Sequence, residues 1–297
     1  MSELRQETRV DVQAGFTRNF FAPHEPGFGV RIAAATHPGH RRPRNEDHYA
    51  VVRRTRGCEM LASNLPDEHV AFVEDHAWGI LVADGIGGAR FGDLASQLAI
   101  ETVLEAARDA TSWVMRYTDM DAQEMRQRVA AYVERIQEAF DQHARQVPDA
   151  REMGTTLTGL YVLPPHAIVT WIGDSRGYLY RQHSLTQITR DHTLAQALEE
   201  AGADRQGVRR FGNILINGLG ASRNKVDVDV QHLHLEYGDR LLVCTDGLSD
   251  MVDHPTLQAS LAIDDLNECC RHLVRQALEA GGRDNITLVI ADIEPAE

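Results

Sequence analysis

Five aspartates stand at the ends of segments rich in β-branched and aromatic residues, a composition that predicts β-strands. Asp84, Asp174 and Asp246 end WGILVAD, IVTWIGD and LLVCTD, whereas Asp47 and Asp284 begin DHYAVV and DNITLVI. In an antiparallel sheet the end of one strand and the start of its neighbour lie at the same edge, so these carboxylates can converge. Converging carboxylates repel one another, and a divalent cation turns that repulsion into coordination. The pattern therefore predicts a metal site.

The types of ligand favour Mg²⁺ or Mn²⁺. Carboxylate, carbonyl and water oxygens suit these hard cations. The 14 histidines are scattered without HExxH or paired spacing, which disfavours zinc. Gly85 follows Asp84 and Gly247 follows Asp246, and each removes a Cβ where the backbone must come close. The carbonyl of Gly85 could itself be a ligand.

Each motif by itself is typical of something simpler. Asp-Gly after a strand is usually a turn, GDSR at 173–176 equally fits a hairpin turn, and Arg41, Arg42 and Arg44 resemble a solvated basic surface. The occurrence of all these motifs in one order along the chain is more informative than any of them alone. Six motifs follow one another along the chain: Arg42-x-x-Asn45-Glu46-Asp47, Asp84-Gly-Ile-Gly-Gly88, Gly154-Thr-Thr156, Gly173-Asp-Ser-Arg176, Thr245-Asp-Gly-Leu248 and Asp284-Asn-Ile-Thr287.

In this order the motifs resemble the protein phosphatase 2C family of metal-dependent Ser/Thr protein phosphatases, in its bacterial single-domain form. The resemblance runs from about Val30 to Ile293. It implies an α-β-β-α sandwich with a binuclear Mn²⁺ or Mg²⁺ centre, to which a third metal can be added. It also implies hydrolysis of phosphoserine and phosphothreonine by direct attack of a water that bridges two metals, without a phosphoenzyme.

The resemblance implies a role for each matching residue. Asp84 is expected to bridge both metals and to be catalytic in that sense, and Arg42 to bind the phosphate through its planar guanidinium. The expected metal ligands besides Asp84 are Asp246 and Asp284 for the first ion, the Gly85 carbonyl and Asp47 with Glu46 for the second, and Asp174 for the third. Residues expected to orient these ligands through hydrogen bonds are Thr155, Thr156, Ser175, Arg176 and Asn285.

Some positions depart from the family pattern. Ile86 stands where animal members carry a histidine suggested as the general acid, and where bacterial relatives commonly carry Met, so the proton donor stays unnamed. His48 and His192 lie in or near motifs and receive no role. Residues 190–220 resemble the flap region of the family. Within it Asn217 begins Asn-Gly-Leu-Gly where many bacterial members have Arg-Ala-Leu-Gly, and the lost charge could change how substrate or the third metal is held.

The helices and strands predicted from the sequence, which must position these residues, indicate an α+β fold. Amphipathic helices are expected at 91–108, 121–146, 192–201 and 265–280. Strands are expected at 30–36, 48–53, 77–83, 156–163, 167–172, 177–181, 226–235, 239–245 and 285–292. The short connections 164–166 and 173–176 indicate antiparallel neighbours. We therefore expect a four-layer α-β-β-α sandwich, two antiparallel sheets flanked by helices.

We expect one catalytic domain over residues 29–297, after an N-terminal extension at residues 1–28. A long excursion at 54–76 interrupts the strands and could be a lid, a docking loop or decoration.

Composition narrows the partners and the compartment. The chain has 297 residues with 30 Lys plus Arg against 44 Asp plus Glu, a formal charge of −14. This argues against nucleic acid and anionic membranes as partners, but not against phosphoproteins, because metals and Arg42 make the site locally positive. The four cysteines show no CxxC spacing, which argues against a disulfide framework. With no signal peptide and no apolar run of about 18 residues, a cytoplasmic protein is expected.

The leading hypothesis is a phosphoprotein phosphatase that opposes a cognate Ser/Thr kinase. A second reading is a pseudophosphatase that binds a phosphoprotein without turnover. A pseudoenzyme usually loses an aspartate from the metal site, whereas all five are present here. A third reading is a phosphatase for a small regulatory phosphoserine protein. Such enzymes often carry sensor domains, for which this chain has little room.

Overall fold

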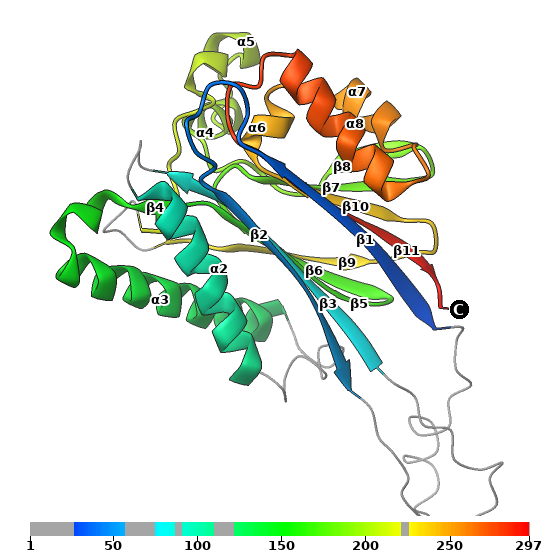
Figure 1. The fold of residues 1–297 in the computed structure, drawn as a ribbon, viewed down its shortest axis with the longest axis horizontal. Coiled ribbons are helices and arrows are strands. Elements are labelled where there is room, and N and C mark those ends of the chain that lie inside the picture. Colours follow the sequence, from blue (N-terminus) through cyan, green and yellow to red (C-terminus); the bar gives the residue numbers. More distant parts are fainter. Residues whose placement is uncertain (1–26, 57–74, 87–90, 110–121, 221–225, 297) are drawn as a thin grey trace, which may run out of the picture.

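The computed structural model describes residues 27–56, 75–86, 91–109, 122–220 and 226–296 (Figure 1). Most of the predicted extension at 1–28 and most of the excursion at 54–76 lie outside these residues, and the first strand already begins at Phe28. The excursion is shorter than predicted, because β2 (Asp47–Arg56) and β3 (Asp75–Ile86) continue into its two ends.

The first sheet contains five antiparallel strands in the order β1-β11-β10-β7-β8. Their bounds are β1 (Phe28–His37), β7 (Arg176–Arg181), β8 (Ser184–Gln187), β10 (Arg240–Cys244) and β11 (Ile286–Pro295).

The second sheet has the antiparallel order β2-β3-β5-β6-β9, and a short strand, β4, pairs with the end of β3. Its remaining bounds are β4 (Gly154–Thr155), β5 (Leu157–Leu163), β6 (His166–Ile172) and β9 (Asp229–His234).

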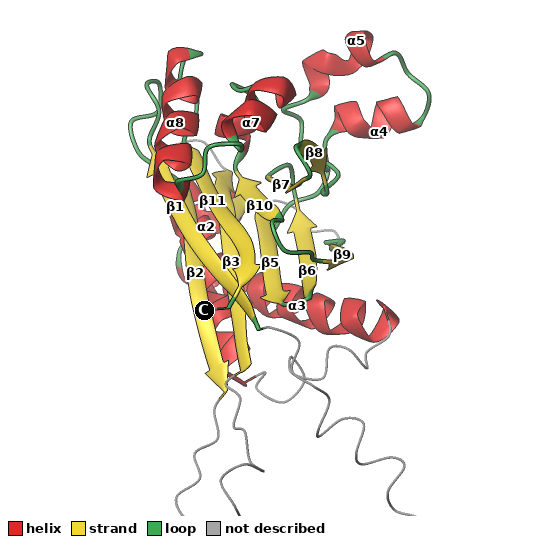
Figure 2. Cartoon of the chain, turned by 90° about the vertical axis from the view of Figure 1, so that its right-hand side faces the viewer, coloured by secondary structure: helices red, strands yellow, loops and turns green. Residues whose placement is uncertain are grey.

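Helices cover the outer face of each sheet (Figures 1 and 2). On the second sheet lie α2 (Gly92–Asp109) and α3 (Ala122–Gln146), and on the first lie α7 (His254–Ser260) and α8 (Leu266–Glu279). The α4 and α5 helices stand apart at one end of the sandwich (Figure 2). The predicted four-layer α-β-β-α sandwich is therefore confirmed. The short helices are α4 (Leu194–Glu200), α5 (Arg205–Val208), α6 (Asp246–Ser249) and the 3₁₀ turns η3 (Pro148–Glu152) and η4 (Arg209–Phe211).

The central strand β10 shows how the layers are held together. All five of its residues are buried. Leu241 and Val243 pack between the two sheets, whereas Leu242 and Cys244 pack beneath α7 and α8. Because side chains alternate across a strand, a strand that is covered on both faces becomes a continuous apolar run. This explains why LLVC reads as a strand without polar alternation.

Sequence reasoning missed the shortest elements. The strands β4 and β8 and the helices α5, α6 and α7 span at most seven residues each, too few to show a clear hydrophobic period. The expected helix at 192–201 begins at Leu194, because the hydroxyl of Thr193 caps it by accepting a hydrogen bond from the backbone N–H of Gln196 at 3.3 Å. The expected strand at 226–235 is shorter, spanning β9 only.

Among the described residues, Cys244, Cys269 and Cys270 are buried free thiols, which agrees with the expectation of no disulfide framework. Cys58 lies outside the described residues. None of the described helices has the length and apolar character needed to cross a membrane.

Candidate metal centre

The five strand-end aspartates lie at one end of the sandwich. Asp47 begins β2 and is the register partner of Asp84 near the end of β3. Asp174 follows β6, Asp246 begins α6 directly after β10, and Asp284 precedes β11. The charges of the other four carboxylates all raise the pKa of Asp84. The convergence predicted from strand order is therefore present.

Burial makes this cluster electrostatically unfavourable for carboxylates alone. Asp47 is 5% exposed and Asp174 is 8% exposed. Burial, with the charges of neighbouring carboxylates, raises the pKa of Asp47 to about 7, of Asp174 to about 8 and of Asp246 to about 6. It raises the pKa of Asp84 well above its ordinary value. A buried anion needs a partner of opposite charge, so the cluster fits cations.

Two oxygens in the cluster are available as ligands. Oδ1 of Asp47 and Oδ1 of Asp246 are buried and have no hydrogen-bond partner among the described residues. Within the same part of the chain, no three His, Cys, Asp or Glu side chains already surround one point as a complete ligand set. Mg²⁺ needs no such set, because it keeps several waters and is held by one or two carboxylates. The donor set thus fits a hydrated, hard divalent ion.

The glycines beside the aspartates are required by close backbone contacts. A Cβ on Gly85 would lie 2.3 Å from the backbone of Gly92 at the start of α2 and 2.8 Å from the carbonyl oxygen of Glu46. A Cβ on Gly247 would lie 1.9 Å from the carbonyl oxygen of Asn285. These contacts confirm that the backbone comes close at both positions, as the sequence predicts.

Glu46 and Arg42 lie at the edge of the cluster. Nη2 of Arg42 donates to Oδ2 of Asp284 at 2.6 Å, and about half of the Arg42 side chain is exposed. Burial raises the pKa of Glu46, while the charge of Arg42 lowers it. An exposed guanidinium beside the carboxylates is well placed to meet an incoming anion.

Thr155, Thr156 and Ser175 hold the backbone at Asp84. The hydroxyl of Thr155 donates to the Asp84 carbonyl at 2.8 Å, and the Asp84 N–H donates to Oγ1 of Thr156 at 3.0 Å. The hydroxyls of Thr156 and Ser175 share a hydrogen bond of 2.8 Å. These residues therefore position Asp84 through its main chain and leave its carboxylate free of them.

Asn285 organises the loop that carries Arg42 and Glu46. Its Oδ1 accepts from the N–H of Glu46 at 2.7 Å, and its Nδ2 donates to the carbonyls of Pro38 and Arg44, each at 2.9 Å. One side chain thus closes the connection from β1 to β2 against the start of β11.

Three residues near the cluster received no role from the sequence. The hydroxyl of Thr245 donates to Oδ2 of Asp47 at 2.8 Å, and Asp191 pairs with Arg176 at 2.6 Å. The charge of Asp250 raises the pKa of both Asp174 and Asp246. Asp250 lies four residues after Asp246, one helical turn on, and that spacing could have signalled its position.

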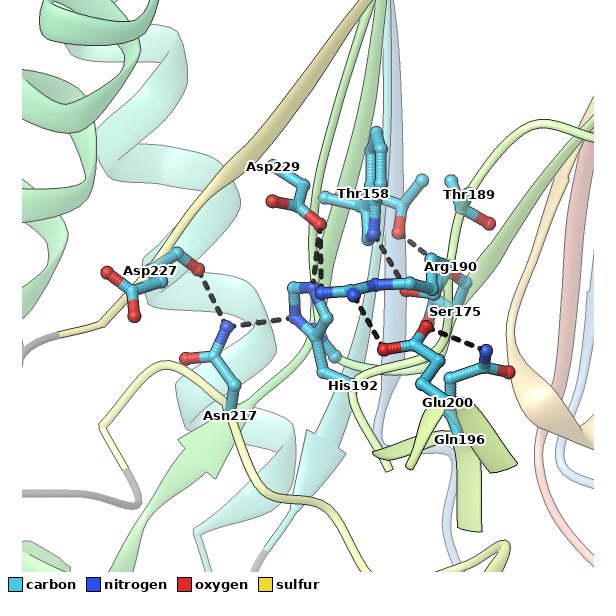
Figure 3. A network of polar contacts seen from close by, with 12 residues as sticks. Thr158, Ser175, Thr189, Arg190, His192, Gln196, Glu200, Asn217, Asp227 and Asp229 are labelled. Carbon is cyan, nitrogen blue, oxygen red and sulfur yellow. Dashed lines mark hydrogen bonds and ion pairs between the residues drawn. The ribbon is translucent and has the colours of Figure 1, made fainter. Parts of the chain in front are cut away.

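His192 is buried and lies at the centre of a polar network (Figure 3). Its Nδ1 accepts from the backbone N–H of Gly173 at 3.1 Å and from Nδ2 of Asn217 at 2.8 Å. Because both partners donate, Nδ1 carries no proton, and Nε2–H donates to Asp229 at 3.3 Å. His192 therefore links the 190–220 segment to the loop that carries Asp174.

The other unassigned residues lie elsewhere. Nδ1 of His48 shares a hydrogen bond of 2.9 Å with the hydroxyl of Ser96, so this ring points to α2 although its neighbour Asp47 is in the cluster. Ile86 is the register partner of Gly154. It also lies beside Gly218, because a Cβ built on Gly218 would be 3.5 Å from Cδ1 of Ile86.

Comparison with known proteins agrees with this fold. Residues 56–280 match the family model described as protein phosphatase 2C. A relative from Listeria monocytogenes, serine/threonine phosphatase stp, is 32% identical over 218 residues, which cover 72% of this chain and 83% of the relative.

Two solved structures are also similar. The Mycobacterium tuberculosis serine/threonine phosphatase PstP/Ppp superimposes with a TM-score of 0.69 at 30% identity, covering 89% of this chain and 99% of that one. The structure of the catalytic domain of the serine/threonine phosphatase PstP in complex with two manganese ions superimposes with a TM-score of 0.68 at 29% identity. The match covers 90% of this chain and 100% of that one.

The family match and these relatives, together with the four-layer sandwich, identify the chain as a metal-dependent protein phosphatase. The chain belongs to the protein phosphatase 2C family. Within that family it is a bacterial-type serine/threonine protein phosphatase.

Proposed function

We propose that residues 29–297 form one catalytic domain that hydrolyses phosphoserine and phosphothreonine in proteins, using two divalent cations, Mn²⁺ or Mg²⁺. The observation that carries this proposal is the meeting of five aspartates, four of them with pKa values raised chiefly by burial. The relative that binds two manganese ions supports the same number of ions here.

The proposed ligands are those that the resemblance to the protein phosphatase 2C family implies. Asp84 lies among the other carboxylates and is proposed to contact both ions. The remaining proposed ligands are Asp246 and Asp284 at the first ion, the Gly85 carbonyl with Asp47 and Glu46 at the second, and Asp174 at a third. When bound, two divalent cations lower the pKa of a shared water and offset the charge of the phosphate.

Arg42 is proposed to bind the phosphate group. A guanidinium has five N–H donors in a fixed fork, and Arg42 uses one nitrogen on Asp284. Its remaining donors can bind two phosphate oxygens in parallel, which fixes the phosphorus relative to the carboxylate cluster. Asn285 supports this arrangement because it holds the loop on which Arg42 lies.

The proposed partners are phosphorylated proteins and a cognate Ser/Thr kinase that supplies them. A formal charge of −14 supports neither nucleic acid nor an anionic membrane as a partner.

Phosphate release from p-nitrophenyl phosphate and from a phosphothreonine peptide tests the proposal. We expect turnover with Mn²⁺, loss of turnover with chelator, and loss in Asp246→Asn. The matched control is Asp141→Asn, which neutralises an exposed carboxylate on α3 and should leave turnover unchanged. Activity that survives both chelation and Asp246→Asn would refute the metal centre. Bound metal without turnover on any substrate would favour the pseudophosphatase.

A further inference from the structure

A cavity of about 160 Å³ lies between the second sheet and the two helices that cover it. It is separate from the metal centre. Leu104 of α2 and Val129 of α3 line one side, and Leu81 and Ile168 of the sheet line the other. From Gly92, beside the metal centre, to Leu104 the α2 helix rises about 18 Å at 1.5 Å per residue.

The cavity exists because the sheet lacks a side chain at one position. Gly79 in β3 has Val52 and Tyr161 as its register partners on either side. Its neighbours in sequence, Trp78 and Ile80, pack between the sheets, so Gly79 faces the helices. A Cβ at Gly79 would meet only Cγ2 of Val52 within 4 Å. At Gly79 the sheet side of the cavity is therefore backbone, next to the side chain of Val52.

One polar atom in this apolar space has no partner. The hydroxyl of Tyr161 is buried and has no hydrogen-bond partner among the described residues, and Tyr161 lines the cavity. Burial raises the pKa of Tyr161 to about 12, so the phenol stays protonated and can donate. A buried donor without an acceptor is unfavourable, and an acceptor brought by a ligand would remove that penalty.

Arg54 lines the cavity near the end of α2. Its Nη1 donates to the carbonyl of Ala107 at 2.9 Å, which joins β2 to the end of α2. The charge of Arg54 also lowers the pKa of Tyr161, so the guanidinium lies on the same side as the phenol. The remaining lining is mostly aliphatic or aromatic. The cavity thus combines a mostly apolar body with the Tyr161 hydroxyl, a buried donor that has no partner among the described residues.

We propose that this cavity binds a small apolar molecule of about the size of benzene that carries one hydrogen-bond acceptor, held by the Tyr161 hydroxyl. An apolar protein cavity of about 150 Å³ is large enough to bind benzene. The acceptor selects among apolar molecules, because only a ligand with one can satisfy the phenol. This site does not depend on the phosphatase reaction.

Ligand-observed ¹⁹F NMR with two probes of similar size tests this proposal. One probe is 4-fluorobenzyl alcohol, which has an acceptor, and the other is 4-fluorotoluene, which has none. We expect both to bind the wild type. In Tyr161→Phe the ratio of the two dissociation constants should shift by about fivefold against the alcohol, the effect of one hydrogen bond. Binding of 4-fluorotoluene to Tyr161→Phe should stay within about twofold of the wild type.

A second variant tests the location. Val129→Phe fills the cavity from α3 and should abolish binding of both probes, and Leu104→Phe does the same from α2 if the first variant does not fold. Near-ultraviolet circular dichroism establishes that each variant is folded. The proposal is overturned if neither probe binds the wild type, if the filled variants bind both as before, or if Tyr161→Phe leaves the ratio unchanged.

Discussion

Asp47 and Asp84 face each other as register partners across β2 and β3, and the charge of Asp47 is one of those that raise the pKa of Asp84. A strand pair that places the buried carboxylate of Asp47 opposite the partly buried carboxylate of Asp84 is unfavourable by itself. The folded protein therefore holds protons at this end of the sandwich that the unfolded chain releases. Metal ions and protons compete for the same oxygens.

This competition predicts how the stability of the chelated protein depends on pH. The unfolded aspartate pKa is about 3.9, whereas the folded values are about 7 for Asp47, about 8 for Asp174 and about 6 for Asp246. Because the folded state keeps these protons over a pH range in which the unfolded chain releases them, folding becomes less favourable as the pH rises. The contribution of these aspartates to the free energy of unfolding is fully present below about pH 4 and is lost as the pH rises to about 8. Urea unfolding in chelator should show the free energy of unfolding falling between pH 5 and pH 8.

A plot of the free energy of unfolding against pH should fall by about 1.4 kcal/mol per pH unit for each proton released on unfolding. Asp47→Asn should make it shallower, because this variant removes one of the raised carboxyl groups. Saturating Mn²⁺ should flatten it, because the ions replace the protons. A free energy of unfolding that is constant or rises with pH in chelator would contradict the raised pKa values.

The 2.6 Å contact between Arg42 and Asp284 leads to a second prediction, about phosphate binding. Arg42→Ala should lower kcat/KM for a phosphothreonine peptide about 10- to 100-fold, because hydrogen bonds to charged groups contribute about 1.5–3 kcal/mol. Arg42→Lys should recover only part of the loss, since an ammonium cannot bind two oxygens in parallel. Arg41→Ala removes an exposed neighbour and serves as the control. Steady-state kinetics with equal losses for Arg41→Ala and Arg42→Ala would contradict a specific role.

A third prediction concerns the buried pair of Arg240 and Asp292, register partners in β10 and β11. Nε and Nη2 of Arg240 donate to the two carboxylate oxygens at 2.5 and 2.8 Å, and Nη1 donates to the carbonyls of Leu261 and Ile263, each at 2.6 Å. Without Arg240 the buried Asp292 carboxylate keeps its 3.1 Å contact with Nη2 of the exposed Arg31 but loses its two shorter hydrogen bonds, so Arg240→Ala should lower the free energy of unfolding by about 3 kcal/mol. Arg271→Ala, which breaks an exposed pair with Glu268, should cost less than about 1 kcal/mol. Equal losses in urea unfolding would contradict the importance of burial.

The fold could be predicted because its long elements repeat a clear pattern. In β10 and β11 the apolar runs are long enough to identify buried strands, and the tight connection at 164–166 joins the antiparallel pair β5 and β6 as expected. The expectation that 173–176 joins a second antiparallel pair was wrong, because this short connection carries the chain from β6 in the second sheet to β7 in the first. The convergence of Asp47, Asp84 and Asp246 followed from strand ends alone. No pattern of this kind marks α6, whose four residues are fewer than would show a helical period.

What sequence could not supply is contact between distant segments. Thr245 reaches Asp47 across 198 residues, and the ring of His192 receives donors from Gly173 and Asn217, which lie 19 and 25 residues away on either side. Such contacts depend on how the chain folds back, and local periodicity does not encode them. The cavity beside Gly79 was missed for the same reason.

The network around His192 provides the last prediction, which concerns the proposed ligand Asp174. His192 is 6% exposed, and its Nδ1 is the acceptor for the N–H of Gly173, the residue before Asp174. Gly173 has φ +105°, and a Cβ there would lie 2.5 Å from Cγ2 of Thr156. The turn that presents Asp174 therefore has little freedom, and the imidazole fixes its orientation.

Two substitutions distinguish the roles of the two ring nitrogens of His192. In His192→Asn the side-chain oxygen can replace Nδ1 as the acceptor for Gly173, whereas in His192→Gln the amide nitrogen can replace Nε2–H as the donor to Asp229 but the acceptor is lost. If His192 acts by positioning Asp174, His192→Gln should need several-fold more Mn²⁺ for half-maximal activity, because misplaced ligands typically cost 10- to 100-fold in metal affinity. His192→Asn should stay close to the wild type. Equal Mn²⁺ requirements in the two variants, with equal thermal stability, would show that His192 serves packing alone.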